Sequence, residues 1–143
     1  MTALLNAIIA RGGTTAHRDP FDVDRMTAHV IAPARGIACH VAERDGAIVG
    51  FQALEWSDPD WTGANPLPAD WAFIATFVAI GMQGTGIGAL LFAATRRAAL
   101  SAGVRMIDAT IRHENRGGLA YYSRMGFEDY WSDAEVIAKK RAP

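Results

Sequence analysis

Four glycines in one short stretch are the residues whose type and spacing most directly suggest a chemistry. Gly81, Gly84, Gly86 and Gly88 follow an apolar strand-like run and lead into a helical pattern in FVAIGMQGTGIGALLFAATRRAAL, residues 77–100. Glycines at such a junction let a ligand approach the backbone, where successive N–H groups at a helix N-terminus bind phosphate. Three ligands fit: a nucleoside triphosphate, a dinucleotide, or the pyrophosphate of coenzyme A.

The neighbouring residues favour coenzyme A. A triphosphate-binding loop ends in Lys followed by Ser or Thr, whereas Gly88 is followed by Ala89 and Leu90. GTGIGA matches the dinucleotide pattern formally, with Asp108 at about the expected distance of 20 residues. However, only 55 of the 143 residues follow Gly88, too few for a doubly wound fold, and Asp108 falls in the middle of a strand. A pyrophosphate held by backbone N–H groups needs no lysine.

A second motif in the chain strengthens the assignment of the glycine-rich loop. NRGGLAYYSRMGF spans Asn115 to Phe127, and a helix and a strand separate it from QGTGIG, Gln83 to Gly88. Together they resemble the Q/R-x-x-G-x-G/A and N-x-x-A-x-x-L-Y-x-x-x-G-F elements of the GCN5-related N-acetyltransferase (GNAT) superfamily. The resemblance covers roughly residues 35–143 well. IIARGGTTA and IATFV are similar to bacterial small-molecule acetyltransferases, including the phosphinothricin-acetyltransferase-like branch.

The resemblance implies acetyl-CoA as co-substrate and assigns residues to its recognition. Backbone groups of the strand before the loop would pair with the pantetheine amides, and the N–H of Val78 or Ala79 would stabilise the oxyanion. The Asn115 side chain would bond the pantetheine arm, although capping the next helix explains it equally well. The implied cofactor-binding residues are Phe77, Val78, Ala79, Gln83, Gly84, Thr85, Gly86, Ile87, Gly88 and Asn115.

Tyr122 matches the family's tyrosine that protonates the departing thiolate. A phenol with a pKa of about 10 stays protonated at neutral pH and can donate that proton. Taken alone, a tyrosine on this helix is more often a packing residue, and Tyr121 would then face the core. The sequence does not identify the general base, because the segment WAFIATFVAI, where many members of the family carry an acid, contains none. The candidates are His113, Glu114, Glu55 and Asp70, or a water molecule.

The segment 57–70, SDPDWTGANPLPAD, is a loop that precedes the proposed cofactor strand. It carries Trp61 with Asp58, Asp60 and Asp70, and Trp56 and Trp71 flank it. Indole faces and carboxylates suit an ammonium-bearing small molecule. The alternative is a surface loop whose tryptophans cap the core. His17, His29 and His40 have no metal-ligand spacing, so no metal is expected.

The elements that must position these residues alternate along the chain. Helices are expected at 2–10, 22–31, about 87–102 and 116–125. Strands are expected at 36–43, 47–55, 71–80, 104–112, 127–131 and 136–139, with a hairpin turn at Asp45-Gly46. This order predicts an α/β (α+β) fold with a mixed, mostly antiparallel sheet and flanking helices, the GNAT acyltransferase fold.

Members of this superfamily usually begin with a strand, but here Met1 already stands at the first helix. The chain therefore either starts downstream of the natural start or lacks that edge strand. An unpaired edge would favour a homodimer.

Composition sets the remaining bounds. The 143 residues predict a single domain over 1–143, and the hydrophobic content of 50% indicates a globular chain. The net charge of −1 gives no electrostatic reason to expect nucleic acid or an anionic membrane as partner. Cys39 is the one cysteine and is expected in the core, and without a signal-like start the expected location is cytoplasmic.

These patterns predict an acetyl-CoA-dependent N-acetyltransferase that acts on a small-molecule amine by direct attack, without a covalent enzyme intermediate. Two alternatives remain open: an acyl-CoA-binding module that does not catalyse, and a protein-lysine acetyltransferase.

Overall fold

The computed structural model describes residues 1–143 and confirms the predicted order of elements. Its helices are α1 (Thr2–Arg11), α2 (Val23–Met26), the π-helix η1 (Thr27–Ile31), α3 (Ile87–Ala102) and α4 (Arg116–Arg124). Its strands are β1 (Gly36–Arg44), β2 (Ala47–Trp56), β3 (Trp71–Val78), β4 (Met106–Arg112), β5 (Glu128–Ser132) and β6 (Val136–Arg141).

The strands form one six-stranded sheet in the order β1-β2-β3-β4-β6-β5. Every neighbouring pair is antiparallel except β3 and β4, which α3 connects. The Asp45-Gly46 turn joins β1 to β2 with both residues at positive φ, 52° and 77°, as predicted for this hairpin. The mixed, mostly antiparallel sheet expected from the sequence is thus confirmed.

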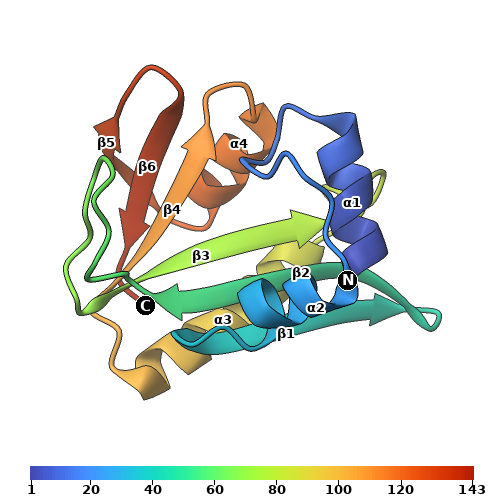
Figure 1. The fold of residues 1–143 in the computed structure, drawn as a ribbon, viewed down its shortest axis with the longest axis horizontal. Helices are drawn as coiled ribbons and strands as arrows, with labels where there is room; N and C mark the ends of the chain where they lie inside the picture. Colours follow the sequence, from blue (N-terminus) through green and yellow to red (C-terminus); the bar gives the residue numbers. More distant parts are fainter.

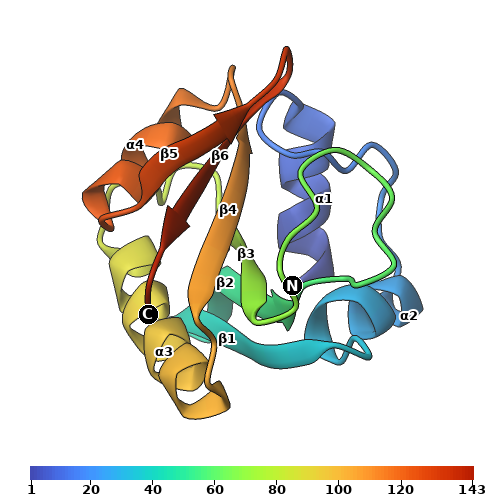
Figure 2. The ribbon, with the colours of Figure 1, turned by 90° about the vertical axis from the view of Figure 1, so that its left-hand side faces the viewer.

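Helices cover both faces of the sheet (Figures 1 and 2): α1 and α2 lie on one face, and α3 and α4 on the other. Each face has its own core. Leu5, Met26 and Phe51 are buried in the core under α1 and α2, and Phe92, Ile107 and Tyr122 in the core under α3 and α4. Cys39 packs at the margin of the first core, in agreement with its predicted structural role.

The structure differs from the sequence-based expectation in the second helix, and it shows the state of the sheet edge at β1. The predicted helix 22–31 divides into α2 and η1, where the Thr27 hydroxyl donates to the Val23 carbonyl and the Ala32 N–H reaches back to the Thr27 carbonyl. A threonine hydroxyl on the carbonyl four residues earlier competes with the helix ladder, which explains the wider last turn. No strand precedes α1 in the described sheet, so the outer edge of β1 is unpaired.

Strands β3 and β4 separate along their length, and this positions the site. They pair over three positions only, Trp71 with Met106, Ala72 with Ile107 and Phe73 with Asp108. Beyond these positions β3 continues beside β2 and β4 beside β6, and Figure 1 shows the two strands diverging. A gap lined by backbone therefore opens in the middle of the sheet, at the end where β3 runs into the glycine-rich loop.

Candidate active site

The backbone of β3 presents hydrogen-bonding groups to the gap. On one side of β3 the Ala79 N–H donates to the carbonyl of Val49 in β2, at 2.9 Å. On the other side the Asp70 carbonyl accepts from the N–H of Arg105, which directly precedes β4, also at 2.9 Å. Because successive residues of a strand direct their backbone groups to alternate sides, the even-numbered residues of β3 face β4. Thr76 and Val78 therefore point their N–H groups into the gap.

This alternation tests the residues proposed for the pantetheine arm. The Val78 N–H points into the gap, as a contact with the pantetheine arm requires. The Val78 carbonyl accepts a 3.4 Å hydrogen bond from the Gln83 side chain. Ala79 is a correction: its N–H is committed to Val49, so it does not serve as the alternative oxyanion donor. Phe77 directs its backbone toward β2 by the same alternation, and its ring packs on Phe51 at a centroid distance of 4.9 Å.

The loop after β3 is a continuous row of free backbone donors. From Gln83 through Ala89, no N–H donates to an acceptor within the protein, and the next donor is Leu90, which bonds the Gly86 carbonyl at 3.1 Å. Gly84 and Gly86 hold this shape with φ of 79° and 89°, where a side chain would be strained. The row ends at the N-terminus of α3, which suits a pyrophosphate.

Side chains of the loop stabilise it from within. The Gln83 carbonyl oxygen accepts from the Gly81 N–H at 2.9 Å, and the Thr85 hydroxyl donates to the Met82 carbonyl at 2.7 Å. Gln83 and Thr85 thus shape the loop, and no charged side chain lies in it. Recognition of an anion by the backbone of this loop stays a prediction.

The Tyr122 ring packs in the core under α3 and α4, with its hydroxyl directed toward β3. Its hydroxyl is 2.8 Å from the Thr76 hydroxyl, which in turn accepts from the Gln52 amide at 2.7 Å. Tyr122 is 6% exposed, and burial raises its pKa well above the ordinary value of a tyrosine, so it stays protonated at any physiological pH. The Tyr122 hydroxyl therefore lies beside Thr76, one of the two β3 residues whose N–H groups face the gap.

Tyr121 packs against the core under α3 and α4, as expected. It is half-buried, with its hydroxyl donating to the Gly88 carbonyl at 2.8 Å, and burial raises its pKa. Tyr122 is the more buried of the two rings.

Asn115 caps α4. Its side-chain oxygen accepts from the Gly118 N–H at 2.9 Å, and its amide nitrogen donates to the Thr14 carbonyl at 3.0 Å. The structure thus shows the capping role that the sequence allowed, together with a tie to the segment after α1. Contact with a pantetheine arm stays a prediction.

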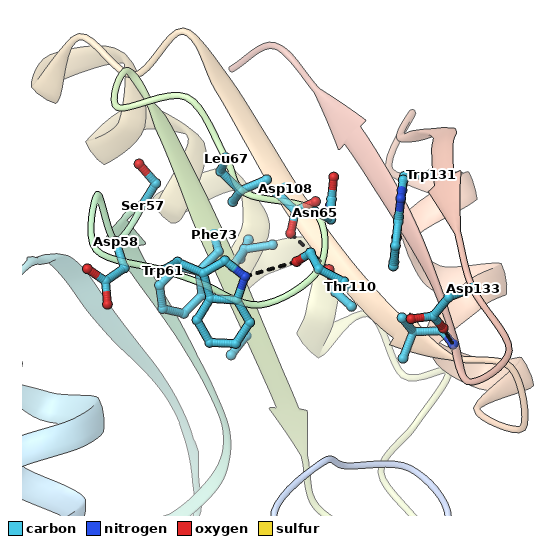
Figure 3. A pocket seen from close by; sticks show the side chains of 14 residues that line it. Ser57, Asp58, Trp61, Asn65, Leu67, Phe73, Asp108, Thr110, Trp131 and Asp133 are labelled. Atoms are coloured by element: carbon cyan, nitrogen blue, oxygen red, sulfur yellow. Dashed lines mark hydrogen bonds between the residues drawn. The ribbon is translucent and has the colours of Figure 1, made fainter.

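A pocket of about 490 Å³ lies on the sheet face that carries α1 and α2 (Figure 3). The loop 57–70 forms one wall with Trp61, and Trp131 of β5 forms the opposite one; Thr110 lies between them, where β3 and β4 separate. Fourteen residues line it: Ser57, Asp58, Trp61, Ala64, Asn65, Leu67, Phe73, Ile74, Ala75, Asp108, Thr110, Trp131, Asp133 and Val136. The pocket therefore adjoins the gap from the side opposite α3.

Of the loop residues singled out from the sequence, Trp61 and Asp58 line the pocket, whereas Asp60 and Asp70 do not. Trp56 packs against the core under α3 and α4, and Trp71 packs edge-on against Tyr130 at 5.6 Å between centroids. The two flanking tryptophans are thus structural.

Asp108, which from the sequence was considered only as a ribose-binding acid, lines this pocket. It is 3% exposed and accepts hydrogen bonds from Tyr130 at 2.7 Å and Thr110 at 3.1 Å. Burial raises its pKa against the opposing effect of these two bonds. The available signal was a single acid in the strand MIDATIR, between the apolar residues Ile107 and Ala109.

The candidate general bases from the sequence are dispersed. Asp70 pairs with Arg105 at 3.5 Å, Glu114 pairs with Arg112 at 2.8 Å, and the His113 ring bonds the Asp133 carbonyl oxygen at 2.9 Å. Glu55 is half-buried on β2 opposite Phe73, and burial raises its pKa. None of these four lines the pocket.

Comparisons with known proteins agree with this geometry. The family described as "Acetyltransferase (GNAT) domain" matches residues 35–129. No curated protein sequence matches the chain.

Solved structures share the fold. A GCN5-related N-acetyltransferase from Kribbella flavida is 18% identical with a TM-score of 0.80, and the match covers 100% of this chain and 90% of that one. A phosphinothricin N-acetyltransferase-like structure is 19% identical, TM-score 0.75, covering 99% and 90%. The yncA protein of Salmonella typhimurium, solved with its cofactor acetyl-CoA, is 14% identical, TM-score 0.77, covering 99% and 85%.

The domain match extends from β1 into β5 and includes the β3–β4 gap, the loop of free N–H groups and Tyr122. The chain belongs to the GNAT family of acetyltransferases.

Proposed function

We propose that the protein transfers the acetyl group of acetyl-CoA to a primary amine of a small molecule. One arrangement carries this proposal: the β3–β4 gap joins the free N–H groups of residues 83–89 to the pocket under the loop 57–70. An acyl donor and an acceptor can thus approach one another from opposite sides of the sheet.

The residues present fit acetyl-CoA as the donor. The row of N–H groups suits its pyrophosphate, and the gap-facing N–H groups of Thr76 and Val78 suit the amides and carbonyl of its arm. Acetyl-CoA supplies an activated thioester. The chain has to orient it, stabilise charge on the carbonyl oxygen and provide a proton to the thiolate.

The proton balance of the reaction assigns the other roles. The acceptor ammonium first loses a proton toward the carboxylates of the pocket, and the neutral amine nitrogen then bonds the acetyl carbon. The carbon–sulfur bond breaks, the thiolate takes a proton from Tyr122, and the second proton of the amine leaves toward the same carboxylates. Tyr122 regains its proton from water, so one proton is released to solvent overall. Tyr122 is kept protonated by its burial and held in place by Thr76.

The loop 57–70 supports a small-molecule acceptor. It covers one side of the pocket, with the Trp61 ring fixed by a 2.9 Å bond from its indole N–H to the Ala64 carbonyl. A lysine on a protein surface would have to enter below this loop, whereas a small amine fits within about 490 Å³.

The test is thiol release from acetyl-CoA in the presence of a panel of amines, with product detected by mass spectrometry. Tyr122→Phe should lower kcat by roughly 10²-fold while acetyl-CoA affinity, measured by calorimetry, stays unchanged. Tyr121→Phe is the matched control, since it removes the neighbouring hydroxyl and should leave kcat much closer to wild type. Acetyl-CoA binding without thiol release on any amine would instead identify a non-catalytic acyl-CoA-binding module.

A further inference from the structure

The charges around the pocket carry information about its ligand that the fold does not. Its lining includes the carboxyl groups of Asp58, Asp108 and Asp133 and no lysine, arginine or histidine. Large apolar side chains provide much of the remaining wall, including Trp61, Trp131, Phe73 and Leu67 (Figure 3). Such a lining favours a ligand that is cationic at one point and apolar elsewhere.

Asp108 is the buried acid among the three. Asn65 donates to the Tyr130 hydroxyl at 2.7 Å, and Tyr130 donates to one Asp108 oxygen, also at 2.7 Å. Thr110 donates to the other oxygen. The Tyr130 and Thr110 hydroxyls both donate to the carboxyl group, so they orient it as a hydrogen-bond acceptor. A carboxylate has about four acceptor positions, which leaves room for an ammonium.

The other two acids are already engaged. Asp58 pairs with Arg35 at 2.8 Å. Asp133 accepts from the N–H groups of Glu135 and Val136 at 2.8 and 2.9 Å, which lowers its pKa. Asp108 has no ion-pair partner, and its burial without a cation raises its pKa.

The cationic side chains near the pocket each interact with a group other than Asp108. Arg35 is paired with Asp58, and Arg112 with Glu114 at 2.8 Å and Glu135 at 4.0 Å. Lys140 is opposite Asp108 in the β4–β6 register, but its ammonium lies over the rings of Trp71 and Tyr130, 5.7 and 5.2 Å from their centroids. His113 bonds the Asp133 backbone, and Glu55 adds a further acid on the same sheet face.

From this distribution we infer that the acceptor is a primary amine on an uncharged apolar or aromatic body, bound through its ammonium at Asp108, and that the pocket rejects the corresponding amino acids. This inference rests on the proposed function, because it names the substrate class of the same site. An α-carboxylate would be desolvated among aspartates with no cation to pair with it, which is costly. Amino acids and other acidic amines should therefore bind weakly.

The experiment uses a series of three ligands that differ at one position: phenethylamine, L-phenylalanine and L-phenylalaninamide. The amide has the size of the amino acid without its negative charge, so it separates charge from steric fit. Binding to the full chain in the presence of coenzyme A is measured by calorimetry, and thiol release from acetyl-CoA is measured separately.

Phenethylamine and phenylalaninamide should bind at least about tenfold more tightly than phenylalanine, a difference that calorimetry resolves easily. Asp108→Asn, which keeps the shape of the side chain, should weaken phenethylamine binding by about tenfold or more and leave acetyl-CoA affinity unchanged. Asp60→Asn is the matched control: it makes the same chemical change in the loop 57–70, outside the pocket lining.

Equal binding of phenylalanine and phenethylamine, or an Asp108→Asn variant that is folded by circular dichroism and binds phenethylamine like wild type, would overturn the inference. Because binding is read without turnover, the two proposals fail separately. Selective amine binding with no thiol release would contradict the transfer reaction and support the pocket's selectivity. Thiol release with phenylalanine as the preferred acceptor would support the transfer reaction and contradict the proposed selectivity of the pocket.

Discussion

The Tyr121 ring occupies the space that a side chain at residue 88 would need. A Cβ at Gly88 would lie 2.7 Å from Cε2 of that ring, and the Tyr121 hydroxyl donates to the Gly88 carbonyl at 2.8 Å. Gly88 therefore has normal helical geometry but a packing requirement, whereas Gly84 and Gly86 are required for their positive φ and have open space around them. The glycine-rich motif thus combines two physical demands, a positive φ in the loop and close contact with α4 at the start of α3.

Gly88→Ala should destabilise the protein by about 1–3 kcal/mol, because the methyl group overpacks against the ring. In a helix without this contact, Gly→Ala is stabilising by up to about 1 kcal/mol. The same change in a Tyr121→Leu background should therefore be neutral or stabilising. Urea unfolding of the four proteins of this double-mutant cycle measures the coupling; a stabilising Gly88→Ala in the wild-type background would contradict the contact.

Gly86→Asp should lower the affinity for acetyl-CoA by more than tenfold, or about 1.4 kcal/mol. The substitution adds a negative charge to the row of N–H groups and a side chain at a φ of 89°. Gly86→Ala is the control, since it carries the same backbone strain of about 1–2 kcal/mol without the charge. Calorimetry at low and high salt separates the two effects, because only the repulsion by aspartate is screened. Unchanged binding in a folded Gly86→Asp variant would move the pyrophosphate away from this loop.

Local patterns allowed much of the fold and the glycine-rich loop to be predicted from the sequence. The hairpin turn, the glycine at the end of α3 and the Asn115 cap each depend on residues within a few positions of one another. The family motifs then placed Tyr122 on the helix that faces the gap.

The parts that could not be predicted depend on contacts between distant segments. Tyr122 bonds Thr76 across 46 positions, and Asp108 is held by Tyr130 across 22. Trp131, the second wall of the pocket, lies on the last hairpin, where no local pattern relates it to the loop 57–70. Which of two adjacent tyrosines is more buried was likewise decided by the packing of α4 against α3 and β3.

Relative to wild type, the unfolding free energy of Asp108→Asn without ligand should increase as the pH rises. Burial raises the pKa of Asp108 in the folded state above its unfolded value. The stability linked to this group is therefore fully present below the unfolded pKa of about 4 and is lost as the pH rises through the folded pKa. Asparagine is neutral throughout, so the difference in unfolding free energy between variant and wild type should grow over this range.

Urea unfolding of both proteins at several values between about pH 3.5 and pH 7.5 checks this expectation. Every other titrating group is common to the two proteins, so the difference isolates residue 108 and its partners Tyr130 and Thr110. A difference that stays constant over the whole range would show that Asp108 is not desolvated.

Trp61→Ala should raise the KM for the amine acceptor by about tenfold and leave the KM for acetyl-CoA unchanged. An indole face beside an ammonium-bearing ligand contributes about 1–2 kcal/mol. Trp61 is suited to this because its ring is 55% exposed and is fixed over Gly63, where an added Cβ would lie 2.4 Å from the indole. A ring this exposed contributes little to the core, so the variant should remain folded. Trp61→Phe keeps an aromatic face and should recover most of the acceptor KM, which steady-state kinetics with each substrate varied in turn can measure. If both KM values stay at wild type in Trp61→Ala, the loop 57–70 takes no part in acceptor binding, and the acceptor would have to approach from α1 and α2.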